Sequence, residues 1–407
     1  MYDFLLTIWD RPDFWSFVAI PFVAAAVGWF TNWIAIEMTF WPLEFIGYKK
    51  LRLGWQGIIP AKAEKMAGIV VDNTLAKLAS LSELFQQMEP EKIAAHISKS
   101  ILERIDDYVD EIMSERNAVL WDNMPLMVKR RVYARVRRQL PFIMDNMVDD
   151  MAENIEELVD LKQMVVKLLA GDKALMVRVF KDVGDVELRF VVNSGLWFGF
   201  LFGFVQMLAW AIYPEPWVMP FFGFLVGYAT NWLALNLIFR PLEPVKVGPF
   251  TVHGLFLRRK FEVADKFALI ATQEVINLKN LMNEVLTGSR SDRTRAMIKR
   301  HLRPLLESGV VRTAIQLTLG AEGYANIKTL VVERAIAMTI GPLADPRFNR
   351  ERASIIHLIF RDKMRVMSNT EFQDLLRPAF QEDEWILVIL GAVLGLVAGY
   401  LQWALMF

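Results

Sequence analysis

Residues 27–35 of this chain read VGWFTNWIA and residues 226–234 read VGYATNWLA, at an offset of 199 positions. Four further residues recur at the same offset: Phe40, Pro42, Leu43 and Glu44 match Phe239, Pro241, Leu242 and Glu243. A second pair of segments matches at an offset of 196, where Gly195, Gly199, Gly203 and Gln206 align with Gly391, Gly395, Gly399 and Gln402. Matches at nearly one spacing are typical of an internal repeat. The sequence therefore predicts two copies of one unit.

The matching segments lie in four apolar blocks, at 14–40, 189–212, 217–240 and 385–407. Each block is close to the roughly 20 apolar residues that a helix needs to cross a bilayer. The second and third blocks are separated by Tyr213-Pro214-Glu215-Pro216, which predicts a helix-breaking turn inside a membrane hairpin. One such block is also consistent with a buried core helix. Four together favour a membrane protein.

Composition narrows the class of protein further. Of the 407 residues, 54% are hydrophobic and 23% are charged, so the chain combines membrane helices with large water-facing segments. The formal net charge is zero, which argues against a nucleic-acid partner. The absence of cysteine excludes disulfides, thiolate metal sites and a cysteine nucleophile.

The predicted fold is an all-α membrane protein of two parallel repeats, each a membrane helix, a helical water-facing domain and a second membrane helix. After an N-terminal tail at 1–13, the water-facing domains occupy 41–188 and 241–384. Because each unit has an even number of spans, both domains lie on one side, and the pseudo-two-fold axis runs along the membrane normal. Within the first domain, the spacing of one buried helix face is shared by Ile93, His96, Ile97, Ile101, Ile105 and Val109. No convincing strand alternation occurs, apart from a short hairpin expected about Gly248 or Gly54.

Basic residues near the span ends predict the orientation. The side that faces the domains carries Lys49, Lys50, Arg52, Lys181, Arg189, Arg240, Lys246, Arg258, Arg259 and Lys260. The other side carries only Arg11. By the positive-inside rule, both domains are expected in the cytoplasm.

Small and polar residues inside the apolar blocks are candidate site residues. The stripes Gly195/Gly199/Gly203 and Gly391/Gly395/Gly399, with Gly28 and Gly227, allow close approach of another backbone. Helix packing is one interpretation, and a narrow groove for lipid or solute is the other. Because the stripes exceed what four helices need, the sequence predicts a homo-oligomer.

Polar groups in hydrocarbon need partners. We predict that Asn32, beside Thr31, faces Asn231, beside Thr230, and that Gln206 and Gln402 interact similarly. Substrate contact is the alternative for these residues. Glu37 lies toward the domain-side end of its block, where its carboxylate either reaches water or has a functional role.

A basic segment in the first domain has two interpretations. It contains Lys129, Arg130, Arg131, Arg135, Arg137 and Arg138, and an acidic stretch from Asp145 to Asp160 follows. Two adjacent helices with complementary solvated faces are the first interpretation. Binding of anionic lipid head groups is the second. A second basic cluster, Arg290 to Arg303, presents the same choice.

No motif for catalysis, metal binding or cofactor binding occurs in the sequence. It lacks a phosphate-binding G-x-x-x-x-G-K-[ST] loop, a G-x-S-x-G elbow and an H-E-x-x-H helix. The four histidines, His96, His253, His301 and His357, lack metal-ligand spacing. The sequence therefore predicts a protein that is not an enzyme and holds no cofactor or metal.

The assembled residues resemble the bacterial membrane-protein family called domain of unknown function 445. The resemblance rests on the element from Gly28 to Trp33, followed by Phe40, Pro42, Gly57, Ile59, Pro60, Lys62, Glu64 and Ala67. The segment from Glu187 to Phe190, before the first glycine stripe, is also similar. The second copy departs from the pattern, with Leu257 where Pro60 stands in the first. The resemblance implies a bacterial cytoplasmic (inner) membrane protein, and it implies no activity.

Three functions are compatible with this organisation. The leading hypothesis is non-enzymatic handling or transport of lipid or another hydrophobic molecule, with the helical domains as a tube or cradle and membrane lipid as the partner. The second is a membrane scaffold whose domains bind proteins. The third is a small-solute transporter.

Overall fold

The computed structural model describes residues 14–48, 53–381 and 384–406. Helices make up 85% of it, which confirms the predicted all-α class. Among the described residues, the strands pair as two antiparallel hairpins, β1 (Ile46–Tyr48) with β2 (Leu53–Trp55) and β3 (Val245–Val247) with β4 (Phe250–Val252). The sequence indicated a hairpin about Gly54 or Gly248, and the structure has one at each position. The predicted tail at 1–13 lies outside the described residues.

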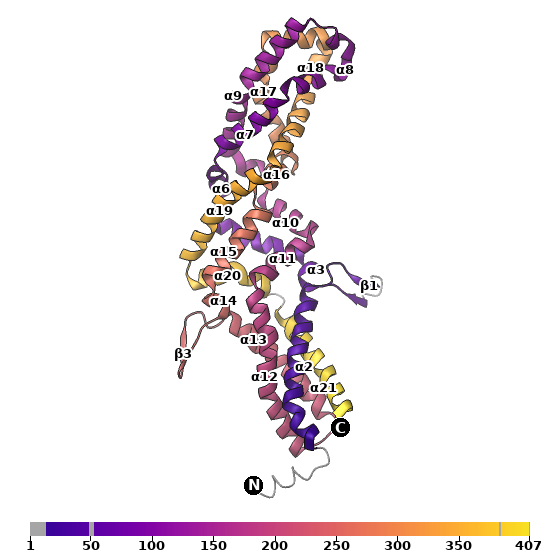
Figure 1. Ribbon diagram of the computed structural model, residues 1–407, viewed down its shortest axis with the longest axis vertical. Coiled ribbons are helices and arrows are strands. Elements are labelled where there is room, and N and C mark those ends of the chain that lie inside the picture. Colours follow the sequence, from indigo (N-terminus) through magenta and orange to yellow (C-terminus); the bar gives the residue numbers. More distant parts are fainter. Residues whose placement is uncertain (1–13, 49–52, 382–383, 407) are drawn as a thin grey trace. The chain divides into compact units, whose positions relative to one another are not determined.

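The chain folds into two compact units, each assembled from segments that are far apart in the sequence (Figure 1). Unit 1 combines Met1–Thr74, Leu169–Phe267 and Lys363–Phe407. Unit 2 combines Leu75–Leu168 and Ala268–Asp362. The chain passes between the units inside four helical elements: the π-helix η2 (Val71–Leu75), α10 (Leu161–Gly171), α15 (Lys260–Ile270) and α19 (Pro346–Val366).

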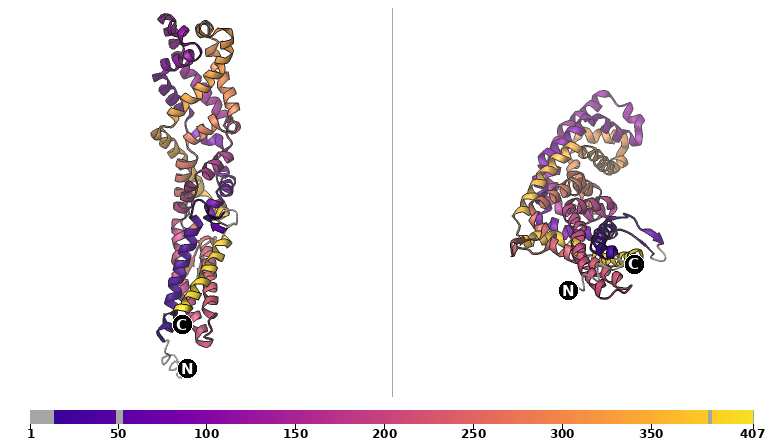
Figure 2. Two further views of the ribbon diagram at one scale, coloured as in Figure 1. Left: turned by 90° about the vertical axis from the view of Figure 1, so that its right-hand side faces the viewer. Right: turned by 60° about the horizontal axis from the view of Figure 1, so that its bottom comes forward.

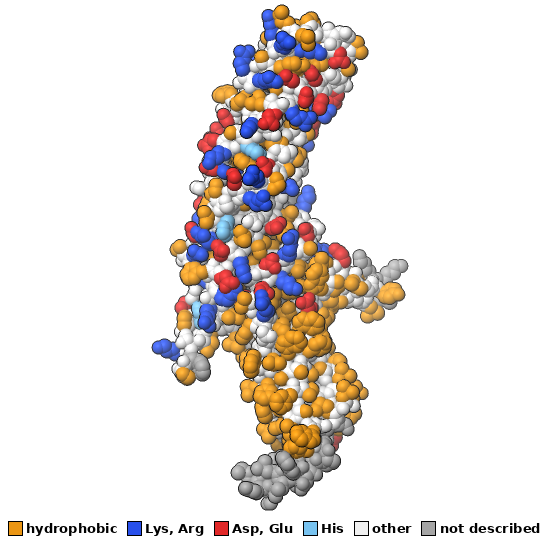
Figure 3. All heavy atoms as spheres, viewed as in Figure 1, with side chains coloured by type: hydrophobic (Ala, Val, Ile, Leu, Met, Phe, Trp, Pro, Cys, Tyr) orange, Lys and Arg blue, Asp and Glu red, His pale blue; other side chains and the backbone are white. Residues whose placement is uncertain are grey.

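Unit 1 contains four helices that are long and apolar enough to cross a membrane: α2 (Phe14–Phe40), α12 (Asp185–Ile212), α13 (Val218–Phe239) and α21 (Glu384–Met406). They confirm a long apolar helix at each of the four predicted blocks. α12 begins before its apolar block, because Asp185 and Glu187 lie in its first turn, where acidic side chains are favourable. The four helices lie side by side in Figures 1 and 2, and Figure 3 shows hydrophobic side chains over their surface.

Each opening helix packs against its own closing helix. α2 lies along α12, and α13 lies along α21, with further contacts between α12 and α13 and between α2 and α21. Near the turn that joins α12 to α13, one hydrophobic cluster contains Phe17, Ile20, Trp210, Val218 and Met219. These large side chains fill the end of the four-helix group that is closest to this turn.

The remainder of unit 1 consists of the two hairpins and of short helices that connect to the other ends of the four long helices. These helices are α3 (Ile58–Ala61), α4 (Ala63–Val70), α11 (Lys173–Val183), α14 (Leu255–Arg258) and α20 (Asn369–Gln381), together with parts of η2, α10, α15 and α19. Arg259 at the start of α15 donates to both carboxylate oxygens of Glu187 on α12, at 2.8 and 2.9 Å. This ion pair attaches the short helices to a long one.

Unit 2 is a group of amphipathic helices. Its shorter elements are α5 (Ala76–Leu78), α6 (Leu81–Gln87), α7 (Pro90–Glu103), the π-helix η3 (Ala271–Val275) and α16 (Leu278–Thr287). Its longer helices are α8 (Ile105–Asp122), α9 (Leu126–Leu158), α17 (Ser291–Leu306) and α18 (Gly309–Leu343). α9 is interrupted at Asn154, and α18 is interrupted at Gly320, where φ is +70°.

The predicted domains 41–188 and 241–384 differ from the compact units. α7, α8 and α9 come from the first segment, yet they pack against α17 and α18 from the second. The physical reason is that each segment supplies helices with an apolar face that its own neighbours do not fully cover. Burial is completed only by helices of the other segment, so the two water-facing segments share one core.

Candidate functional site: an apolar cavity in unit 2

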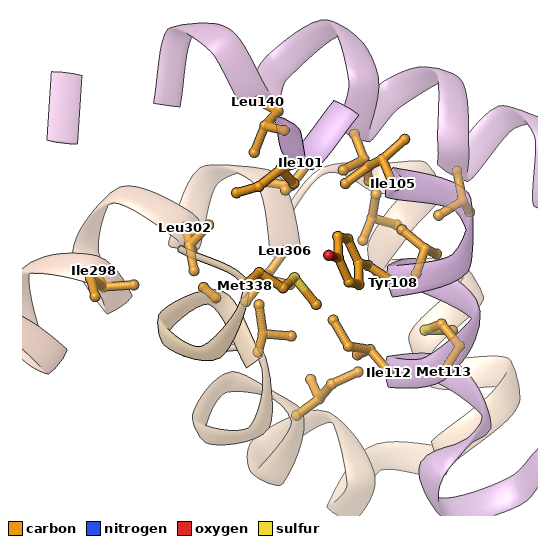
Figure 4. A pocket seen from close by; sticks show the side chains of 18 of the residues that line it. Ile101, Ile105, Tyr108, Ile112, Met113, Leu140, Ile298, Leu302, Leu306 and Met338 are labelled. Atoms are coloured by element: carbon orange, nitrogen blue, oxygen red, sulfur yellow. The ribbon is translucent and has the colours of Figure 1, made fainter. Parts of the chain in front are cut away.

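Unit 2 contains a cavity of about 120 Å³. Its wall is formed by α8, α9, α17 and α18, with Ile101 from α7, and it consists almost entirely of aliphatic side chains (Figure 4). The lining includes Ile105, Val109, Ile112 and Met113 from α8, Val132, Val136, Leu140 and Met144 from α9, Leu302 and Leu306 from α17, and Val311, Ile315 and Met338 from α18.

The sequence signal for this wall is periodicity. Ile101, Ile105 and Val109 were predicted to form a buried face, and the structure confirms their burial. The contribution of α9 was missed, although Val132, Val136 and Leu140 recur every four residues and so share one helix face. The arginines between these three residues form the charged face of the same helix. They dominate the local composition, so the apolar face is less apparent in the sequence.

The cavity offers little polar chemistry. Thr339 donates its hydroxyl to the carbonyl oxygen of Ala335 at 2.8 Å, so this hydroxyl is already used within α18. Tyr108 lies among the aliphatic side chains in Figure 4, and the guanidinium of Arg104 lies 5.2 Å from the centre of its ring. Tyr108 is the one titratable residue among the described residues that line the cavity. The site is therefore suited to an apolar molecule with a small polar edge at Tyr108.

The predicted membrane motif lies in unit 1 and serves helix packing within the chain. A Cβ atom at Gly199 would lie 2.7 Å from the carbonyl oxygen of Ala24, and one at Gly203 would lie 2.6 Å from the Cα of Pro21. Gly28 meets Gly195 in the same way. The corresponding contacts join Gly227 to Gly391, Gly223 to Gly395, and Met219 to Gly399. Helices α2 and α13 of the same chain pack against the glycine stripes, so the stripes do not require a second chain.

The predicted pairing of Asn32 with Asn231 is wrong. Asn32 donates to the carbonyl oxygen of Val191 at 2.9 Å, and Asn231 donates to that of Leu387 at 3.0 Å. The reason is the glycine contact: α2 lies so close to α12, and α13 so close to α21, that each amide reaches a backbone carbonyl of its own closing helix. Each asparagine therefore joins an opening helix to its own closing helix.

We expect Asn32→Leu and Asn231→Leu each to lower the free energy of unfolding by about 1 kcal/mol, the net worth of one such hydrogen bond. A larger loss is not expected, because each Oδ1 accepts no hydrogen bond from a described residue, and leucine removes that buried acceptor too. Since the two bonds share no partner, the double variant should be additive within about 0.5 kcal/mol in a denaturation cycle. A coupling energy above about 1 kcal/mol would instead indicate that the two amides pair with each other.

The other polar members of the motif have local partners. Gln206 donates to the Oε1 of Gln402 at 3.4 Å, the interaction expected from the sequence. Thr31 and Thr230 donate to the carbonyl oxygens of Gly28 and Gly227, one turn earlier in the same helix. Glu37 forms a half-exposed ion pair with Lys181 at 3.6 Å. None of these contacts requires a bound substrate.

The basic segment and the acidic stretch do not form two complementary helices, because the basic residues and the acidic residues from Asp145 to Glu157 all belong to α9, with Asp160 just after its end. The acidic half faces α17 instead. Arg290 lies 3.5 Å from Asp160, Arg293 lies 3.5 Å from Glu157, and Asp150 contacts both Arg300 and His301. α17 carries the second basic cluster, so this cluster is largely neutralised. The first basic cluster keeps most of its charge.

The start of α9 is fixed to α8 by a polar network around Asp110. Trp121 Nε1 donates to Asp110 Oδ1 at 2.8 Å, and the hydroxyl of Tyr133 donates to the same oxygen. Burial raises the pKa of Tyr133, and its hydrogen bond to Asp110 raises this pKa further. Tyr133 is therefore a neutral donor at physiological pH, and the turn between α8 and α9 has a fixed geometry.

A scan against protein families found no match for this chain, and a search of curated proteins found none either.

Proposed function

We propose that this protein is a non-enzymatic integral membrane protein that handles or transports lipid or another hydrophobic molecule, and that the cavity of unit 2 holds a short segment of the apolar chain of that molecule. The observation that carries the proposal is the aliphatic cavity of about 120 Å³. An empty cavity costs about 24 cal/mol per Å³, or about 3 kcal/mol for this volume. An acyl chain in the cavity recovers the missing dispersion contacts, whereas water finds few hydrogen-bond partners there.

The finer organisation belongs to the same proposal. The sequence matches support two parallel repeats, and the basic residues near the span ends support placement of the water-facing segments in the cytoplasm of a bacterium. Membership of the family called domain of unknown function 445 is a hypothesis that rests on the Gly28–Trp33 and Gly57–Ala67 motifs. A homo-oligomer stays a prediction, although the glycine stripes no longer support it.

The test is mass spectrometry of lipids retained by the purified full-length protein. We expect stoichiometric acyl lipid to survive detergent exchange, and we expect Ala335→Phe, which places a ring in the cavity, to reduce its retention at least about tenfold. Ile340→Phe on the exposed side of α18 is the matched control and should retain lipid as the natural chain does.

Two other results separate the alternatives. A natural chain that carries no lipid after exchange would contradict the proposal and favour a scaffold whose domains bind proteins. Equal lipid loss from Ala335→Phe and Ile340→Phe would place the lipid outside the cavity. A solute transporter would need a polar pathway through unit 1. The polar groups of unit 1 described above form contacts within and between its helices, so they do not support such a pathway.

A further inference from the structure

One end of unit 2 exposes apolar side chains beside a cluster of basic ones. We call this surface the apolar-basic patch; it contains Val119, Leu120, Leu126, Met127, Lys129, Arg130, Arg131, Arg135, Arg138 and Val310. Val119, Leu126 and Met127 are 68%, 69% and 67% exposed. Figure 3 shows Lys and Arg side chains next to hydrophobic ones at the end of unit 2 where α8 meets α9. Large apolar groups this exposed indicate a binding surface.

Two distant segments of the chain build the patch. Leu126, Met127 and the arginines at the start of α9 line a groove together with Ser308, Gly309 and Val310 at the start of α18. The apolar residues of the turn before α9 stay exposed, because the fully buried Trp121 already occupies the interior of unit 2 at this turn. Lys129 lies over the Trp121 ring at 5.2 Å and holds the turn from outside.

The charge of the patch is not compensated. Residues 119–138 contain six basic side chains and a single acidic one, Asp122. Arg137 is neutralised by Asp106 at 2.7 Å. Within the described part of the chain, Arg130, Arg131 and Arg135 form no ion pair, and all three are exposed or half-exposed. The partner of this surface is therefore anionic as well as apolar.

We infer that the apolar-basic patch docks on the surface of an anionic phospholipid membrane. Leu126 and Met127 precede Arg130 and Arg131 by four residues, which is about 6 Å along a helix. That rise matches the roughly 5–10 Å between phospholipid head groups and the acyl boundary that apolar anchors reach. The apolar tip enters the acyl boundary while the guanidinium groups stay at the phosphates.

The inference goes beyond lipid binding in the cavity and is tested by a different signal. Because the chain lacks cysteine, Met127→Cys can be labelled with the environment-sensitive fluorophore NBD in the full-length protein. The labelled protein is placed in phosphatidylcholine nanodiscs. Phosphatidylglycerol is then supplied either in the disc itself or in added vesicles. NBD emission is expected to rise and shift to the blue in one of these two arms, which identifies the membrane that is contacted, and to stay unchanged with phosphatidylcholine alone.

Two controls make the result specific. Label at Ser354→Cys, an exposed position of α19, should not respond. Arg130→Gln/Arg131→Gln/Arg135→Gln should need about 100-fold more anionic lipid, since each arginine contributes roughly fivefold near an anionic surface. Lys99→Gln/Arg347→Gln/Arg350→Gln removes the same charge from exposed positions that do not line the groove and should bind as the natural chain does.

Three results would overturn the inference: no NBD response in either arm, an equal response from the label at Ser354→Cys, or equal loss of binding in the two triple variants. The cavity proposal is unaffected by each of them, because lipid retention in Ala335→Phe is measured separately. Conversely, Ala335→Phe should keep its response to phosphatidylglycerol even if the cavity holds no lipid.

Discussion

Arg259→Met is expected to lower the free energy of unfolding by about 3–5 kcal/mol, because it leaves the carboxylate of Glu187 buried without its partner. The side chains of Glu187 and Arg259 are 5% and 13% exposed, and their closest atoms are 2.8 Å apart. Glu187 also lines a small apolar cavity of about 60 Å³ at the ends of the long helices, and none of the described residues that line this cavity is a lysine or an arginine. The loss should appear in urea or thermal unfolding of the purified protein.

The double variant Glu187→Leu/Arg259→Met should be less destabilised than Arg259→Met alone, since removing both partners also removes the unpaired charge. The matched control is Arg303→Met, which breaks the more exposed pair with Glu307 and should cost no more than about 1 kcal/mol. If Arg259→Met and Arg303→Met lower the free energy of unfolding equally, the Arg259–Glu187 pair does not attach α15 to α12.

Arg259 also contacts Glu262 and lowers the pKa of that carboxyl to about 2. Because Glu262 is half exposed, we expect little from its loss alone.

Gly195→Ala is expected to lower the free energy of unfolding by about 1–3 kcal/mol, the usual cost of an extra methyl group in a tightly packed interface. The added Cβ would collide with the backbone carbonyl of Gly28 and would lie 2.8 Å from Asn32 Nδ2. Neither α2 nor α12 can relieve this contact by rotating a side chain. The two helices must separate, which also lengthens the hydrogen bond from Asn32 to Val191.

Gly341→Ala is the matched control for this prediction. Gly341 lies in α18, and a Cβ atom added there would have no neighbouring atom within 4 Å outside its own helical turn. Alanine is favoured over glycine in a helix by up to about 1 kcal/mol, so this variant should be unchanged or slightly more stable. Opposite signs for the two substitutions would support close backbone contact between α2 and α12. If Gly195→Ala leaves the free energy of unfolding unchanged, α2 and α12 are not in contact at Gly195.

The cavity and the apolar-basic patch lie on different faces of the same stretch of α9. Val132 and Val136 line the cavity, whereas Arg131 and Arg135 line the exposed groove. A helix with one aliphatic and one cationic face matches both parts of an anionic amphiphile. In the two proposals, α9 therefore has two related roles: it binds an acyl chain, and it docks on a lipid surface.

Features that depend on local composition and periodicity could be predicted from the sequence. The four long apolar helices follow from runs of apolar residues, because the hydropathy of a segment depends on its own residues alone. The buried face at Ile101, Ile105 and Val109 follows from the helical period. A hairpin was expected about Gly54 or Gly248, and both positions have one.

Tertiary structure alone decided which faces meet. Asn32 finds Val191, a backbone carbonyl 159 positions away, and any residue type could have supplied that acceptor. The acidic half of α9 finds α17, and the core of unit 2 mixes helices from both water-facing segments. The cavity itself is a remainder of packing among α8, α9, α17 and α18. Such features depend on the shapes of several distant segments at once, whereas hydropathy and periodicity describe each segment separately.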